Sequence, residues 1–265
     1  MDIVGYLASV FIGISLGLIG GGGSILTVPV LVYLFSVDAV LATAYSLFIV
    51  GTTSIIGSIS YFKKGLINIK TAVAFGIPSI AGVFLTRAFI LPAIPQQIFS
   101  IGNFAITKSI LLMLLFAVLM IFASYSMIKR CKGEDCLPSE TQTVSTLLII
   151  IQGLLVGVVT GLIGAGGGFL IIPALVNLLR LEIKKAIGTS LLIIALNSLF
   201  GFTISATHLT VDWVLLFKIL ALAIAGVLIG SYLSKKIDGK KLKPAFGWFV
   251  LAMGIYILIK ETLLH

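Results

Sequence analysis

Long apolar runs, interrupted by short polar or glycine-rich breaks, follow one another along most of the chain. Most of these runs approach the roughly 20 residues that a membrane-spanning helix needs. Two runs of about 13 residues, each placed directly after a glycine cluster, are shorter, and we expect half-helices or re-entrant elements there. The ten predicted segments are 3–19, 24–36, 40–61, 71–91, 104–128, 144–163, 168–180, 185–206, 212–233 and 244–263.

The same pattern recurs in the second half of the chain. GLIGGGGSILTVPVL begins at Gly17 and GLIGAGGGFLIIPAL begins at Gly161, and a gap-free shift of 144 residues matches 11 of 18 positions in this region. The shift also pairs Ser46 with Ser190. We therefore predict two membrane repeats of about five segments each, 1–128 and 144–265, joined by a linker loop at 129–143.

Composition fixes the fold class. Hydrophobic residues make up 59% of the 265 residues and charged residues 10%, whereas soluble domains carry about 25% charged residues. The apolar runs are continuous rather than alternating, which argues against a β-barrel. The predicted fold is an all-α polytopic membrane protein with glycine-broken or re-entrant half-helices.

Basic residues occupy alternate loops in the two halves. The loop after the third segment is basic in the first half, and the loops after the second and fourth segments are basic in the second. Because each half has an odd number of segments, an inverted second half places all these loops and the linker on one side. The positive-inside rule makes that side cytoplasmic, so we expect a multi-pass inner-membrane protein with both termini outside. The basic residues are Lys63, Lys64 and Lys70, then Lys129, Arg130 and Lys132, then Arg180, Lys184, Lys185, Lys235, Lys236, Lys240, Lys241 and Lys243.

The charge pattern leaves the number of crossings open. Ten crossings, or six crossings plus two hairpins that enter and return, keep every basic loop on the same side. The formal net charge of +9 is explained by these loops, and we expect no nucleic-acid partner.

The two glycine runs, 20–23 and 164–168, predict a binding cavity. Unwound backbone is tolerated within a membrane only where protein or water covers its polar groups. A helix that starts after such a run presents free amides, which attract anions. The alternative is tight helix packing, since Gly13 with Gly17 and Gly157 with Gly161 form GxxxG pairs, and the two interpretations are compatible.

The third segment of each half adds polar side chains to this cavity. Asn197 is the one amide well inside these segments, and interhelical hydrogen bonding and pathway lining are equally open for it. The candidate substrate-binding residues are Gly20, Gly21, Gly22, Gly23, Ser24, Ser46, Gly164, Gly166, Gly167, Gly168, Thr189, Ser190 and Asn197.

The placement of charged residues favours an anion as the substrate. All nine Asp and Glu residues lie at segment ends, in loops or at termini, which disfavours a cation transporter or a carboxylate-relay pump. Arg87, Lys108 and Lys218 lie toward the outer ends of their segments. Snorkelling to the interface is the favoured role for these cations, and attraction of an anion at the mouth is the alternative.

The two cysteines, Cys131 and Cys136, lie in the linker loop. We interpret them as reduced cytosolic thiols, with a redox pair or half of a metal site as the alternatives. Because no histidine cluster accompanies them, neither a metal nor a cofactor is expected.

The paired glycine runs, each ending in a proline, resemble those of the TauE/SafE sulfite exporter family, and so does the KAIGTSLLIIALNSLFG segment. The family's glycine motif maps onto Gly20, Gly22, Gly23 and Pro29, and onto Gly164, Gly166, Gly167 and Pro173. The first half departs from the GTS form and has Ala44-Tyr45-Ser46 instead. The resemblance implies a polytopic inner-membrane transporter of sulfur-containing anions such as sulfite, thiosulfate or sulfoacetate.

These observations predict a secondary transporter that moves a small anion, of the sulfur oxyanion or organosulfonate class, by alternating access. A passive anion channel with the same glycine-lined pathway is the alternative. A membrane-embedded enzyme is disfavoured because no acid, histidine or cysteine constellation lies within the segments. The expected partners are the small anionic substrate and the lipid bilayer, and a homodimer is left open.

Overall fold

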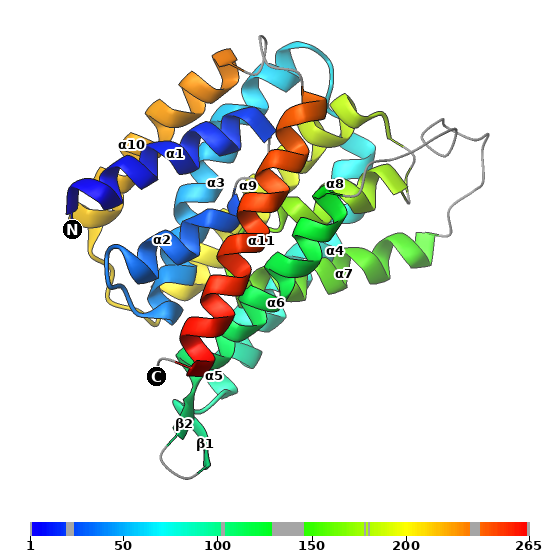
Figure 1. The fold of residues 1–265 in the computed structure, drawn as a ribbon. Coiled ribbons are helices and arrows are strands. Elements are labelled where there is room, and N and C mark those ends of the chain that lie inside the picture. The colour runs from blue at the N-terminus through cyan, green and yellow to red at the C-terminus, as the bar shows by residue number, and fades with distance from the viewer. Residues whose placement is uncertain are drawn as a thin grey trace.

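The computed structural model describes residues 2–19, 24–101, 104–128, 146–177, 179, 181–233 and 239–263. Three features of the sequence lie outside the described residues: the first glycine run, Gly20–Gly23, the two cysteines, Cys131 and Cys136, and the whole of the predicted linker loop at 129–143. The fold is all-α apart from one short hairpin (Figure 1).

The first half contains α1 (Asp2–Ile19), α2 (Thr27–Tyr33), α3 (Ala39–Lys63), α4 (Ile69–Leu85), the π-helical turn η2 (Thr86–Ile90), α5 (Leu91–Ala93), β1 (Gln97–Ile101), β2 (Phe104–Thr107) and α6 (Lys108–Ile128). The second half contains α7 (Thr146–Ile163), α8 (Gly168–Asn177), α9 (Ile183–Ala206), α10 (Trp213–Leu233) and α11 (Gly239–Leu263). Five described helical stretches are long and apolar enough to cross a membrane: Ala39–Lys63, Ile69–Ala93, Lys108–Tyr125, Lys184–Ala206 and Trp213–Leu233.

The helices that follow the glycine runs are short. At a rise of about 1.5 Å per residue, the 7 residues of α2 and the 10 residues of α8 extend about 10 and 15 Å. The hydrocarbon core of a bilayer is about 30 Å thick. Neither helix crosses it alone, as the sequence predicts.

One predicted segment begins differently. The apolar stretch assigned to 104–128 starts as strand β2, which pairs antiparallel with β1, and the helix begins only at Lys108. Four apolar or small residues in a row fit a strand as well as a helix, so the pattern alone cannot separate the two.

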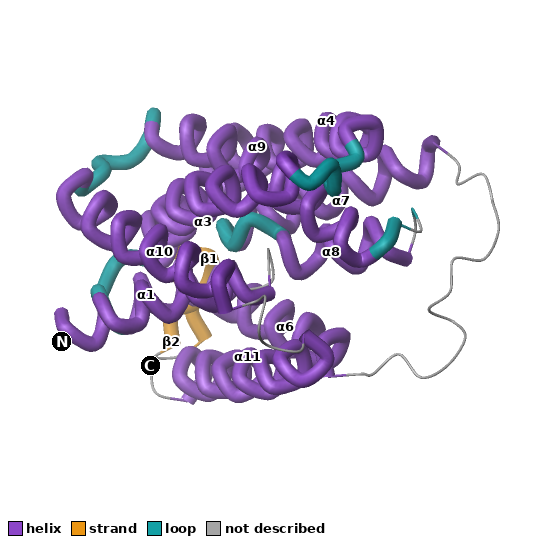
Figure 2. The backbone as a smooth tube through the Cα atoms, turned by 90° about the horizontal axis from the view of Figure 1, so that it is seen from above, coloured by secondary structure: helices purple, strands orange, loops and turns teal. Residues whose placement is uncertain are grey.

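The bundle is organised around α3 and α9. Of the most apolar stretch of each helix, 67% is buried in α3 and 61% in α9, against 39% in the α4 stretch and in α10. Around this central pair, α1 packs on α10, α4 packs on α7, and α6 packs on α11 at one edge of the bundle (Figures 1 and 2).

Glycines make the close contacts of two of these pairs, and the contacts recur at the 144-residue shift. A methyl group on Gly13 would overlap the carbonyl oxygen of Ala223, and one on Gly157 would overlap that of Ser79. Gly157 lies 144 residues after Gly13, and Ala223 lies 144 residues after Ser79, so the two contacts are equivalent in the repeat. The GxxxG glycines therefore serve helix packing.

The contacts between α3 and α9 are reciprocal in the same register. A methyl group on Gly57 would meet Leu191 at 3.5 Å, and one on Gly201 would meet Leu47 at 3.1 Å. Residues toward the N-terminus of α3 thus face residues toward the C-terminus of α9, and the reverse also holds, so the two helices run antiparallel. Equivalent helices that cross antiparallel are related by a twofold axis perpendicular to them.

Candidate functional site

The second glycine run turns the chain between α7 and α8. The amide of Gly164 donates to the carbonyl oxygen of Thr160 at 2.9 Å and closes the last turn of α7. Gly164, Gly166 and Gly167 then adopt positive φ angles of 74°, 69° and 72°, which residues with a Cβ rarely adopt. The repeated glycines are required by this backbone path.

The run is also enclosed by three helices. A methyl group on Gly164 would overlap Thr43 of α3, and one on Gly167 would overlap the hydroxyl of Thr160 on α7. At Gly166 a methyl group would come within 2.5 Å of Val50 Cγ1 and 3.1 Å of the hydroxyl of Ser198 on α9. The unwound backbone is therefore covered by protein, as membrane insertion demands.

Two buried hydroxyls without partners, those of Thr160 and Ser198, lie against this run, and further such atoms lie on α3 and α9. Among the described residues, no hydrogen-bond partner faces the buried hydroxyls of Thr160 and Ser198 or the side-chain oxygen of Asn197. The hydroxyls of Ser46 and Ser54 on α3 are buried in the same way. A buried polar group without a hydrogen bond costs about 1–3 kcal/mol, so these groups favour a polar ligand or water beside them.

The other predicted residues have structural partners. The amide nitrogen of Asn197 donates to Ser79 Oγ at 2.6 Å, which is the interhelical bond that the sequence left open. Thr189 Oγ1 accepts a hydrogen bond from the backbone amide of Asn68 at 3.0 Å. Ser190 Oγ donates to the carbonyl oxygen of Ile187 at 2.8 Å. Ser24 is buried in the turn before α2. Thr189 and Ser190 thus lie near the α3–α4 loop, about two helical turns of α9 before Asn197.

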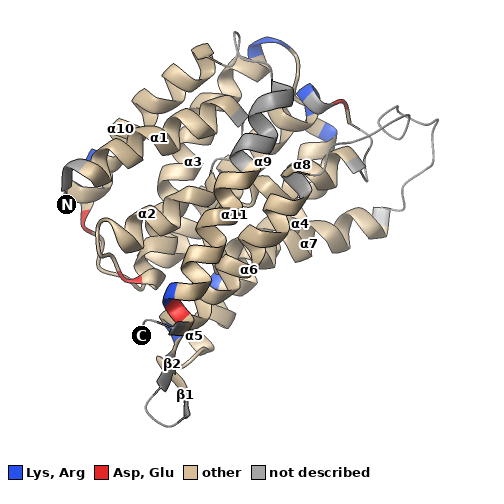
Figure 3. Ribbon diagram, in the orientation of Figure 1, with Lys and Arg blue, Asp and Glu red and all other residues tan. Residues whose placement is uncertain are grey.

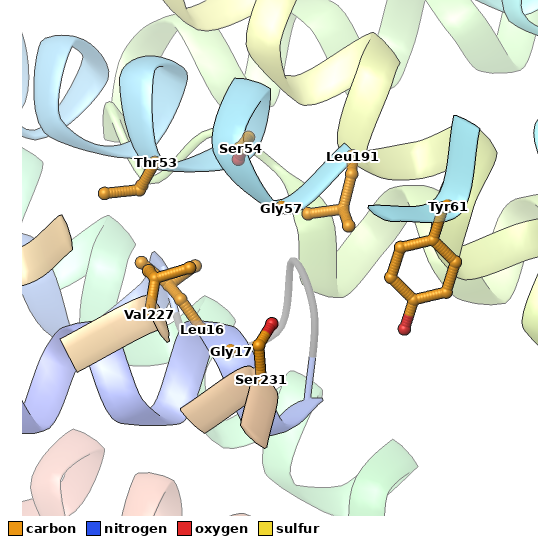
Figure 4. A pocket seen from close by; sticks show the side chains of 9 residues that line it. All are labelled: Leu16, Gly17, Thr53, Ser54, Gly57, Tyr61, Leu191, Val227 and Ser231. Carbon is orange, nitrogen blue, oxygen red and sulfur yellow. The ribbon is translucent and has the colours of Figure 1, made fainter. Parts of the chain in front are cut away.

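A small cavity lies between α1, α3, α9 and α10, and we call it the accessible chamber (Figure 4). Its volume is about 10 Å³, close to the space that one water molecule needs. It is lined by Leu16, Gly17, Thr53, Ser54, Gly57, Tyr61, Leu191, Val227 and Ser231.

A larger cavity of about 530 Å³ lies where α2 and α3 meet α6 and α11. Its charged lining is mixed, with Asp38 and Glu261 beside Lys260. Glu261 accepts from the Tyr33 hydroxyl at 2.7 Å, and Lys260 Nζ lies 4.0 Å from the centre of the Tyr33 ring. Two carboxylates in this lining repel an anion.

The two ends of the bundle differ in charge. Lysines predominate at the end where α3 passes into α4 and α9 begins, with Glu182 as an acid among them, whereas the opposite end is more evenly mixed in sign (Figure 3). The Asn68–Thr189 hydrogen bond ties these two basic segments together. Their proximity is expected if the basic loops share one side of the membrane.

Burial of Arg87 corrects the expectation from sequence. The side chain is 2% exposed and donates through Nη1 to Ser205 Oγ at 3.2 Å, so it does not snorkel outward. Lys108 is 6% exposed and donates to the Leu91 carbonyl, whereas Lys218 is exposed as expected. The sequence signal for a buried cation was the position of Arg87 inside an apolar segment. The direction of its side chain was not predictable, because its partner Ser205 lies 118 residues away in the chain.

Comparison with known proteins identifies the family. The pattern of the family described as Sulfite exporter TauE/SafE matches residues 6–257. A "Probable membrane transporter protein" of Xylella fastidiosa (strain 9a5c) is 31% identical over 254 residues, which cover 93% of this chain and 91% of the relative. The "Probable membrane transporter protein YjnA" of Bacillus subtilis (strain 168) is 26% identical over 260 residues, 97% of this chain and 100% of the relative. No solved structure matches the chain.

The family pattern spans both glycine runs, both half-helices and all five apolar stretches that are long enough to cross a membrane. The chain therefore belongs to the sulfite exporter TauE/SafE family and is a multi-pass membrane protein of the transporter type.

Proposed function

We propose that this protein is a secondary transporter that carries a small sulfur oxyanion or organosulfonate across the inner membrane by alternating access. The observation that carries the proposal is the second glycine run, which is enclosed by three helices and faces buried hydroxyls without partners. Oxyanions accept hydrogen bonds, and hydroxyl and amide donors in a dry site bind them strongly.

The end of α7 and the start of α8 supply further donors. Among the described residues, no acceptor is recorded for the backbone amides of Ala165, Gly166 and Gly167. These amides precede the N-terminus of α8, where the helix dipole favours a negative charge. We assign the substrate to this position, with Thr160 and Ser198 as the neighbouring hydroxyls.

The reciprocal contacts support alternating access. Antiparallel packing of α3 on α9, with Gly57–Leu191 matched by Gly201–Leu47, is the arrangement that inverted repeats produce. In our proposal the basic ends of α3 and α10 face the cytoplasm and both termini face outside. Exchange of the packing between the two halves then opens the site first to one side and next to the other.

Flux in proteoliposomes tests the proposal. The purified protein is reconstituted, and uptake of sulfite, thiosulfate, sulfoacetate, sulfate and taurine is measured with and without imposed sodium, proton and potential gradients. We expect at least one sulfur anion to accumulate against its own gradient when a driving gradient is present.

The outcomes separate the two transport classes. Accumulation above equilibrium supports a carrier, because a passive pore cannot move a solute uphill. Flux that is downhill under every gradient supports the anion channel instead. Absence of flux for every sulfur anion, in vesicles that contain folded protein, contradicts the assigned substrate class.

A further inference from the structure

The accessible chamber has a counterpart in the other half of the repeat. Four residues of its lining are the more exposed ones: Gly17, Gly57, Tyr61 and Ser231. The positions equivalent to them, 144 residues away in the chain, are Gly161, Gly201, Ser205 and Arg87. Contacts join this second set: Arg87 donates to Ser205, and a methyl group on Gly201 would meet Val83, the equivalent of Val227, at 2.9 Å. We call it the closed chamber.

The two chambers differ in exposure. Gly17, Gly57, Tyr61 and Ser231 are all partly exposed. Their equivalents Gly161, Gly201, Ser205 and Arg87 are all buried. The deeper residues are buried in both chambers, including the pairs Thr53–Asn197 and Ser54–Ser198. Equivalent positions are thus partly exposed to solvent in one chamber and buried in the other, as alternating access requires.

The closed chamber holds a charge that its neighbours do not balance. Arg87 uses Nη1 on Ser205, but neither Nε nor Nη2 has an acceptor among the described residues. The one ion pair in the described part of the chain joins Lys185 to Glu182. A buried guanidinium without a counter-charge is costly, and an anion that binds it recovers that cost.

A polar stripe on α9 connects this charge to the glycine run. Ser205, Gly201 and Ser198 recur at helical spacing on one face, and Ser198 lies against Gly166. From Ser205 to Asn197 is eight residues, or about 12 Å along the helix. The equivalent stripe on α3, from Tyr61 to Thr53, lines the accessible chamber.

We propose that Arg87 is an anion-binding residue on the outer half of the pathway, where its guanidinium binds the sulfur oxyanion or sulfonate when the closed chamber opens. This inference rests on the proposed function and adds to it a cationic subsite distinct from the glycine run. The planar guanidinium can donate two parallel hydrogen bonds to two oxygens of such a group. Lys108, buried at the same end of the bundle, adds positive charge near the entry.

The test compares Arg87→Gln with Lys218→Gln, which also removes one cation from the same side but is exposed on α10. Both variants and the wild type are purified and reconstituted, and the half-saturating concentration for flux of sulfite, thiosulfate and sulfoacetate is measured. Stabilisation against heat by each anion, relative to sodium chloride at equal ionic strength, reports binding without transport. We expect Arg87→Gln to raise the half-saturating concentration by at least about tenfold, and Lys218→Gln to leave it unchanged.

Arg87→Lys keeps the inference testable if Arg87→Gln does not fold. Lysine preserves the charge but lacks the planar fork, so affinity is expected to fall by several-fold and remain above that of Arg87→Gln. Equal half-saturating concentrations and equal thermal stabilisation in the wild type and a folded Arg87 variant overturn the Arg87 site and leave the proposed function standing. Absence of flux and of stabilisation by every sulfur anion in the wild type overturns both.

Discussion

The accessible and closed chambers are built from equivalent positions, yet they pair large and small side chains in opposite order. In the accessible chamber the large residue is Tyr61 on α3, opposite the small Ser231 on α10. In the closed chamber the small residue is Ser205 on α9, and the large one is Arg87 in η2, directly after α4. Each chamber thus keeps one large and one small residue. The exchange leaves the backbone symmetric and gives the two sides different chemistry.

This difference suggests how a symmetric fold acquires a direction. In our proposal the guanidinium at one mouth attracts the anion strongly, whereas the aromatic ring at the other carries no charge and presents a negative face. If the two mouths face opposite sides, the anion meets unequal affinities on its way through. In our proposal the repeat supplies the mechanism of opening, and the side chains that break the repeat supply selectivity.

The largest effect is expected when a glycine run is filled. Gly166→Leu places a side chain against Val50 and Ser198 at a residue with φ of 69°, so flux should be abolished while the protein remains in the membrane. Gly22→Leu, its equivalent in the first run, should have the same effect. Flux and membrane content are measured together for each variant.

Gly65→Leu is the matched control. Gly65 also has a positive φ, of 65°, but no atom lies within 4 Å of its missing Cβ. Flux in this variant should stay near the wild-type value, which separates crowding from backbone strain. Normal flux in both Gly22→Leu and Gly166→Leu removes the glycine runs from the pathway.

A smaller effect, on stability, tests the equivalence of the halves. Gly13→Ala and Gly157→Ala each drive a methyl group into a carbonyl oxygen of the partner helix, and each should lower stability by about 1–3 kcal/mol. Thermal unfolding in detergent should show similar losses for the two. Gly76→Ala, whose methyl group would lie 3.8 Å from Ile193, should be neutral or stabilising. A loss confined to one half shows that the two interfaces are not equivalent.

The smallest effect distinguishes two equivalent helix starts. Asp38 and Glu182 are 144 residues apart and precede α3 and α9, but only Asp38 caps its helix, through the Val40 amide at 2.9 Å. Asp38→Ala should cost about 1 kcal/mol. Glu182→Ala loses an exposed ion pair and should cost about 0.5 kcal/mol or less. Equal costs by thermal unfolding contradict this assignment of the caps.

Periodicity and repetition predicted most of the fold. Segment bounds agree with the helices to within a few residues because apolar length and glycine breaks are local properties. The half-helix at Gly168–Asn177 was predictable for the same reason. Strand β2 was missed because its four residues continue the apolar run of α6.

The candidate site was predictable only in part. The sequence drew attention to the glycine run through the repeat, to Asn197 as the one amide of its segment, and to Arg87 as a cation within an apolar run, but it did not single out Thr160 or the burial of Arg87. Thr160 faces Gly167 only once the chain turns back on α7, and the partner of the buried Arg87 is Ser205, 118 residues later. Such contacts between distant residues leave no periodic signal in the sequence.

The packing of α1 on α10 has a consequence for how the chain is made. Gly13 contacts Ala223, so α1 emerges from the ribosome and enters the membrane about 210 residues before its partner exists. In contrast, Thr86 contacts Val158, only 72 residues later. The α4–α7 pair can therefore assemble before α10 is made, while the small-residue face of α1 has no α10 to pack on until that helix inserts. A chain truncated before α10 would present that face to lipid or to other helices, so synthesis of α10 completes the interface of α1.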